Sequence, residues 1–188
     1  SRFRKNSPHP EDRRYVYRPP MSPMPPQASG GVGGRNVDIV AKVTYKKGDE
    51  GVLYASGTQN SGVSVFIQNG RLLLDYNAFG DHTIIESSGL VPEGDHELRA
   101  VLRRGDGMSG YLEVTIDGVS GGSAEVSLYM RMISSVGPSV GFDHGSPVST
   151  RYSAPYAYTG VLHEIIIESG PRRVDTAKAE AQAEMNRQ

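Results

Sequence analysis

Apolar and polar residues alternate along the chain from residue 35 onward. The clearest run is NVDIVAKVTY (36–45), in which every second residue from Val37 to Tyr45 is apolar. The same period recurs in GVSVFIQ (62–68), HELRAVLRR (96–104), YLEVTID (111–117) and GVLHEIIIES (160–169). Because successive side chains of a strand point to opposite faces, this alternation predicts strands with one buried face. In the last run His163 falls on the apolar face, which predicts a hydrogen-bonded core histidine.

Glycine-containing turns separate these runs about every ten residues, the spacing of an all-β domain. Asn69-Gly70 and Asp117-Gly118 are suited to type I′ turns, in which both central residues have positive φ. Short strands with such turns predict an all-β fold. We expect two antiparallel sheets packed face to face as a jelly-roll sandwich.

Composition divides the chain into three parts. Residues 1–34 are rich in proline and glycine, which predicts an extended interdomain linker. The apolar cluster Tyr15–Tyr17 predicts that part of this linker packs against another protein surface. Residues 35–169 form the predicted sandwich domain. Residues 170–188 form a tail that is rich in Ala, Glu, Lys and Gln, which predicts a short C-terminal helix.

Charge and composition limit the classes of partner that we expect for this chain. The chain has 20 Lys and Arg against 21 Asp and Glu, a net charge of −1. Residues 1–18 are basic, but prolines interrupt this stretch. We therefore expect no nucleic-acid partner. No apolar run approaches the length of a membrane span, so we expect no membrane partner either. The absence of cysteine excludes disulfides, thiolate metal sites and a cysteine nucleophile. It is compatible with a reducing compartment, and the cytoplasm is favoured over the periplasm or secretion.

Catalytic motifs are missing from the sequence. There is no G-x-S-x-G elbow and no phosphate-binding loop, and the five histidines show no ligand spacing. A carboxylate pair for glycoside cleavage remains open among the acidic residues of the predicted strands. These residues are Asp75, Glu86, Glu113 and Glu164. Asp143 is the best single candidate for a calcium ligand, but an aspartate that caps its own turn explains it as well.

The segment GFDHGSPVSTRY (141–152), with the residues that follow it to 158, is the most distinctive stretch. It joins two predicted strands, and its glycines and prolines restrict the backbone. Its tyrosines are of the residue type enriched at interface cores. The predicted interface or glycan-binding residues are Asp143, His144, Tyr152, Tyr156 and Tyr158. The alternative is that these rings plug the open end of the sandwich. No metal ligand is assigned.

Three stretches in order resemble the C-terminal domain of bacterial arylsulfatases. They are residues 51–80, residues 92–102 and GFDHGSPVSTRYSAPYAYTGVLHEIIIE (141–168). In that family a β-sandwich of concanavalin A or laminin G type follows a catalytic α/β domain. The resemblance implies a non-catalytic domain of a sulfuric ester hydrolase. The expected partner of this domain is the catalytic domain, which it would support. A second copy of the chain is a further candidate partner.

The alternative function is a carbohydrate-binding, lectin-like module, either free-standing or appended, with a glycan as partner. The absence of Trp argues against it, because stacking on sugars favours Trp. The sulfatase motif C/S-x-P-x-R is also absent, since Ser153-Ala154-Pro155-Tyr156-Ala157 has Ala in place of Arg. No catalytic residue carries over, and this chain is expected to be neither an enzyme nor bound to a cofactor. The resemblance implies that the parent arylsulfatase needs calcium or magnesium and a formylglycine in its catalytic domain.

Overall fold

A computed structural model describes residues 13–19, 33–131, 133 and 137–170, and the structural statements below concern these residues. The predicted C-terminal helix falls almost wholly on residues 171–188, which lie outside them. None of the described segments is a helix long and apolar enough to cross a membrane.

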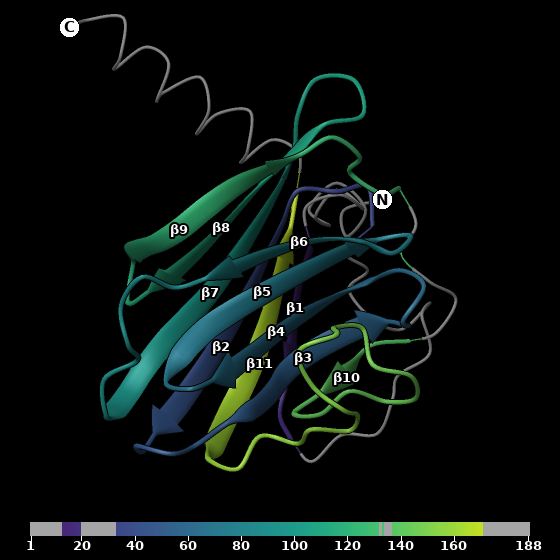
Figure 1. The fold of residues 1–188 in the computed structure, drawn as a ribbon. Coiled ribbons are helices and arrows are strands. Elements are labelled where there is room, and N and C mark those ends of the chain that lie inside the picture. The colour runs from purple at the N-terminus through teal and green to yellow at the C-terminus, as the bar shows by residue number, and fades with distance from the viewer. Residues whose placement is uncertain (1–12, 20–32, 132, 134–136, 171–188) are drawn as a thin grey trace, which may run out of the picture.

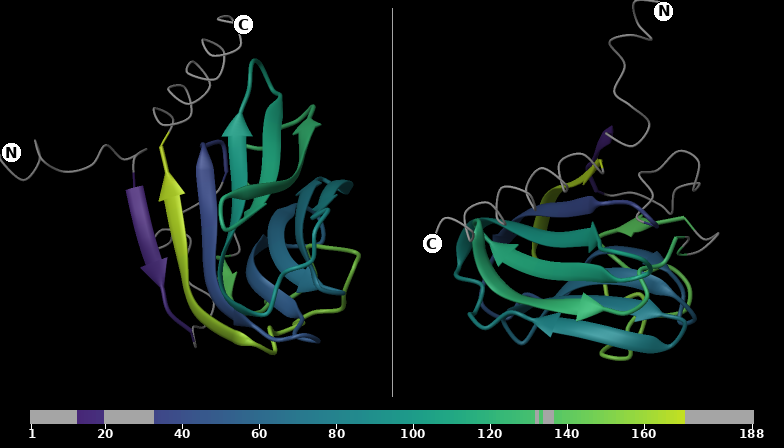
Figure 2. Two further views of the ribbon diagram at one scale, coloured as in Figure 1. Left: turned by 90° about the vertical axis from the view of Figure 1, so that its left-hand side faces the viewer. Right: turned by 90° about the horizontal axis from the view of Figure 1, so that it is seen from above.

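The described chain forms two antiparallel sheets packed face to face, as predicted (Figure 1). The six-stranded sheet has the order β1-β11-β2-β7-β8-β9, and the five-stranded sheet has the order β10-β3-β4-β5-β6. Figure 2 shows the layers from two further sides, with β1 at the edge of its sheet. The strands are β1 Arg13–Tyr17, β2 Val37–Tyr45, β3 Gly51–Gly57, β4 Gly62–Gln68, β5 Arg71–Ala78, β6 Asp81–Glu86, β7 Gly94–Arg104, β8 Gly110–Ile116, β9 Val119–Val126, β10 Ser139–Val140 and β11 Val161–Ser169.

The apolar residues of the predicted alternating runs form the core between the two sheets. The apolar face of β2 is buried from Val37 to Tyr45, and it meets the inward residues of β4, β5, β7 and β8 in one cluster. The predicted turns are also confirmed: φ is 53° at Asn69 and 74° at Gly70, and 51° at Asp117 and 83° at Gly118. Local turn chemistry and a two-residue period therefore account for most of the sandwich.

Part of the predicted linker is a strand. Residues 13–17 form β1, which pairs with β11 from Arg13↔Ser169 to Tyr17↔Ile165. Tyr17 is buried in the core, and Arg18 lies 3.2 Å from a carboxylate oxygen of Glu164. The expected docking of the Tyr15–Tyr17 cluster is therefore observed, and its partner is β11 of the sandwich. Five residues are too few to alter a composition dominated by proline and glycine, and the strand is stabilised by pairing with β11 and by burial of Tyr17, contacts that composition does not reveal.

The predicted core position of His163 is wrong. The register between β11 and β2 shifts between Leu162 and Glu164, which marks a β-bulge or a similar irregularity. Leu162 packs against the core instead, and His163 is exposed, with its Nε2 2.8 Å from Oγ1 of Thr44. A count with period two assumes an uninterrupted pleat, so it misplaces every residue on one side of such a shift.

Candidate functional site

The segment between β10 and β11 lies across the outer face of the five-stranded sheet (Figure 1). The backbone N–H of Val52 in β3 donates to the carbonyl of Tyr156 at 2.7 Å, and Ala157 forms a parallel bridge with Val52. Beneath the segment lies a small apolar cluster separate from the main core. It consists of Val52, Ala55, Phe66 and Leu73. The segment from residue 141 to 158 is thus a cover over one sheet face.

Two of the predicted tyrosines pack on this cluster. The Tyr152 ring meets Phe66 edge-on, with centroids 5.0 Å apart, and it stacks on Tyr156 at the same distance. These two rings therefore cover the outer face and do not plug the open end of the sandwich. Tyr158 instead packs against the main core, and its hydroxyl donates to the carbonyl of Thr44 at 3.3 Å.

Asp143 holds the cover together, and its partner Tyr152 links the cover to the sheet. The Asp143 side chain is 1% exposed, and its Oδ2 accepts a hydrogen bond from the Tyr152 hydroxyl at 2.5 Å and another from the Val148 N–H at 2.9 Å. The Tyr152 hydroxyl also lies 2.8 Å from Oγ of Ser64 in β4. Burial raises the pKa of Asp143 above its ordinary value, and these two hydrogen bonds oppose the shift only in part.

The pKa of Asp143 leads to a prediction about pH. A carboxyl whose pKa is raised in the folded state favours folding when protonated, so its contribution to stability falls as pH rises above about 4. We expect the unfolding free energy of the wild type, relative to Asp143→Asn, to decrease between about pH 4.5 and pH 7.5. Urea unfolding of both proteins at the two pH values measures this difference. An increase would mean that the hydrogen bonds outweigh burial and keep the carboxylate charged.

The other predicted residues do not converge on one site. His144, beside Asp143, is exposed. Asp75 is fully buried on β5, its Oδ1 lies within hydrogen-bond distance of Nδ1 of His82 at 2.9 Å, and burial raises the pKa of Asp75. Glu86 shares the five-stranded sheet with Asp75, whereas Glu113 and Glu164 belong to the six-stranded sheet. Within the described ranges, no group of three or more His, Asp or Glu is arranged to hold a metal.

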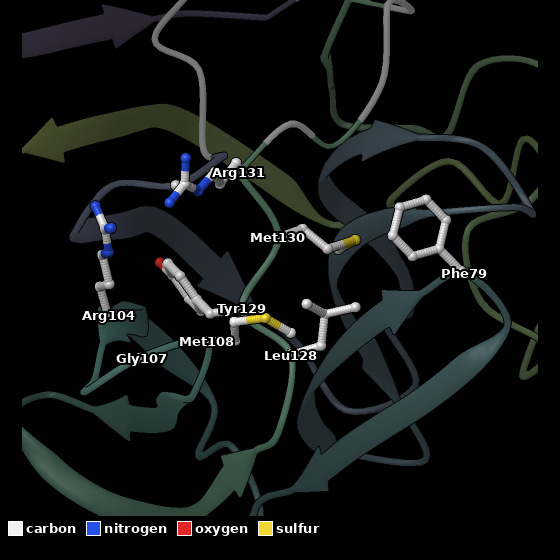
Figure 3. Close-up of a pocket in the computed structure, with 9 residues that line it drawn as sticks. Phe79, Arg104, Gly107, Met108, Leu128, Tyr129, Met130 and Arg131 are labelled. Carbon is white, nitrogen blue, oxygen red and sulfur yellow. The ribbon is translucent and has the colours of Figure 1, made fainter.

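An open pocket of about 430 Å³ lies at one end of the sandwich (Figure 3). It is formed by the β5–β6 turn, the β7–β8 loop and residues 128–131 after β9. Its lining consists of Gly34, Phe79, Arg104, Gly107, Met108, Leu128, Tyr129, Met130 and Arg131. Figure 3 shows the side chains of Phe79, Leu128 and Met130 on one side and the two guanidinium groups on the other. The pocket thus combines an apolar wall with a cationic one.

The floor of the pocket is firmly held and its walls are exposed. Tyr129 and Met130 are buried, and the Tyr129 ring stacks on Tyr76 with centroids 5.7 Å apart. The Met130 N–H donates to the Tyr76 hydroxyl at 2.7 Å. By contrast, Phe79 is 70% exposed and Met108 is 67% exposed. Large apolar side chains exposed together around a pocket are typical of an interaction site.

The two arginines of the pocket differ from others in the sandwich. Arg14, Arg18, Arg71, Arg99, Arg103 and Arg151 each have a carboxylate oxygen within 4.0 Å. Arg104 and Arg131 are exposed and have no such partner in the described part of the chain. Sequence reasoning missed this pocket. The available signal was an apolar residue, Phe79, at the tip of a predicted turn.

Comparison with known proteins identifies the fold. No protein-family model matches the chain, and no curated protein matches it significantly. Among solved structures, domains LG4-5 of the mouse laminin α1 chain are 18% identical with a TM-score of 0.51, and the match covers 85% of this chain and 40% of that one. The chain has a laminin G-like sandwich fold. The NanB sialidase from Streptococcus pneumoniae, in complex with a chlorobenzylammonio ethanesulfonate, is 14% identical with a TM-score of 0.55.

The sialidase match covers 77% of this chain and 24% of the enzyme. The chain therefore spans less than half of either protein. The predicted concanavalin A/laminin G-like architecture is confirmed. Identities this low establish the fold alone, so the predicted arylsulfatase parent rests on the sequence motifs.

Proposed function

We propose that this chain is the non-catalytic β-sandwich domain of an arylsulfatase-type sulfuric ester hydrolase, and that it supports the enzyme by binding its catalytic domain. Two observations support the proposal. The arylsulfatase-like motifs occur in order over residues 51–168. The laminin G-like fold is the one that the resemblance implies for an accessory domain.

The observation that carries the proposal is a contrast between two places in the structure. The polar side chains of Asp143 and Tyr152 bond to each other, whereas the pocket beside Phe79 is open. Asp143 and Tyr152 lie in the most distinctive stretch of the sequence, and Tyr152 also bonds to Ser64 on the sheet. The pocket is lined by apolar side chains and arginines, with no nucleophile beside a base. Such a lining suits binding better than proton transfer or covalent catalysis.

The lectin-like alternative has less support. Sugar stacking needs an exposed aromatic face, and the rings of Tyr152 and Tyr156 are stacked on each other over Phe66. Both are only partly exposed. Tyr152 and Tyr156, two of the tyrosines that would replace the missing Trp, are therefore engaged in holding the cover on the sheet.

The decisive test is the reading frame upstream of residue 1. We expect it to encode an α/β domain with the motif C/S-x-P-x-R, together with Asp and Asn residues that bind a divalent cation. A frame that encodes a different type of domain, or none, would overturn the sulfatase proposal. Finding the motif would give the sandwich its catalytic partner.

The purified chain itself is expected to show no arylsulfatase activity, because its sequence lacks the C/S-x-P-x-R motif in which formylglycine forms. The assay uses 4-nitrophenyl sulfate with added calcium or magnesium, and the released nitrophenol is followed by absorbance. Boiled chain and buffer serve as controls. Turnover that co-purifies with the folded chain through two different columns would contradict the proposal.

A further inference from the structure

We infer that the pocket beside Phe79 is the docking site for the catalytic domain, and that it receives an apolar side chain flanked by carboxylates. The identity of the partner rests on the proposed function. The position of the site and the chemistry of its occupant rest on the described residues alone.

The first argument comes from three hairpin turns of the same type. Two-residue turns connect β4 to β5, β5 to β6 and β8 to β9, and both turn residues have positive φ in each. The first position of such a turn favours Asn, Asp or Gly. Two of the turns have Asn69 and Asp117 there, whereas the third has Phe79 at φ 54°. A bulky side chain is unfavourable in this conformation. The sequence therefore has an aromatic ring at a position where the backbone favours a small polar residue.

The second argument is that the fold does not use this ring. Phe79 is among the most exposed large apolar residues, and the turn is held by other groups. The Gly80 N–H donates to Oδ1 of Asn77 at 2.8 Å. Asn77 is fully buried, and its Nδ2 donates to the carbonyls of Gln59 and Val148. Since the turn is held from below, the Phe79 ring is available to a partner.

The third argument concerns the chemistry of the occupant. An apolar side chain entering between Phe79 and Met108 would remove both from water, which favours association. Arg104 and Arg131 border the same pocket and have no carboxylate partner in the described chain. Guanidinium groups pair with carboxylates in a bidentate geometry, so acidic residues beside the apolar one would complete the contact.

A second copy of this chain fits the pocket less well. In a two-fold dimer the same patch meets itself. A contact centred on the pocket would then place Arg104 and Arg131 of one copy near the same arginines of the other. Like charges brought together in this way oppose association. The charges thus favour a different, acidic surface, such as one on a partner domain.

The test uses the longer protein with a protease site inserted upstream of Arg13, so that β1 stays with the sandwich after cleavage. We expect the cleaved wild-type halves to remain together on gel filtration. Phe79→Asn, and separately Arg104→Gln with Arg131→Gln, should weaken their association at least tenfold by titration calorimetry. Leu90→Asn is the matched control, because Leu90 is 61% exposed and outside the pocket. It should bind as the wild type does.

Two outcomes would overturn the inference: wild-type halves that separate on cleavage, or a Phe79→Asn variant that binds as tightly as the wild type. The isolated chain provides a further readout. Phe79→Asn should leave its thermal midpoint unchanged or raise it, because Asn suits the turn, and a fall of several degrees would show that the ring serves the fold. If the upstream reading frame encodes a different type of domain, the sulfatase proposal is refuted. The docking test then still applies to that domain.

Discussion

Tyr152→Ser is expected to destabilise the isolated chain by about 3–5 kcal/mol, the range for removing a large packed ring. The substitution removes the ring that packs on Phe66 and Tyr156, and it leaves Asp143 without the hydroxyl that donates to it at 2.5 Å. A buried acceptor that loses its donor costs further stability. Urea unfolding followed by circular dichroism measures the loss directly.

Two controls separate the ring from the hydroxyl and from the surface. Tyr152→Phe keeps the ring and removes only the donor, so we expect a loss of about 1–3 kcal/mol. Tyr111→Ser changes a more exposed tyrosine outside the cover, and it should cost far less. If Tyr152→Ser cost no more than Tyr111→Ser, the cover would not contribute to the fold. The predicted interface role of Tyr152 and Tyr156 would then be the better explanation.

Gly51→Ala is expected to cost about 3 kcal/mol or more, because it combines backbone strain with a steric clash. Gly51 has φ +124°, and a Cβ there would lie 2.4 Å from the carbonyl oxygen of Ala157. The clash would push the cover away from β3, where Val52 bonds to Tyr156. We therefore also expect trypsin to cleave after Arg151 faster than in the wild type.

Gly48→Ala is the matched control for this clash. Gly48 also has positive φ, +97°, but a Cβ there would meet nothing within 4 Å. It should show only the strain of an L-residue in that conformation, about 1–2 kcal/mol. Equal losses for the two variants would mean that the cover moves freely and that close contact with β3 is not needed.

The sequence by itself determined the features that depend on neighbouring residues. The alternation from Val37 to Tyr45 predicted a strand with one buried face, since side-chain direction has a period of two. Asn69-Gly70 and Asp117-Gly118 predicted type I′ turns, since few residues tolerate positive φ. Strands of this kind joined by such turns were enough to predict the sandwich.

Tertiary structure alone decided the features that depend on residues far apart in the chain. Residues 13–17 became a strand because β11 offered an edge to pair with, and His163 moved to the surface because of a register shift. Tyr152 is 88 residues from Ser64, its hydrogen-bond partner beneath the cover. The pocket likewise combines Phe79 with Arg104 and Met130, which come from separate segments. Periodicity describes which way a side chain points on its own strand, whereas these contacts are set by how strands and loops are placed against one another.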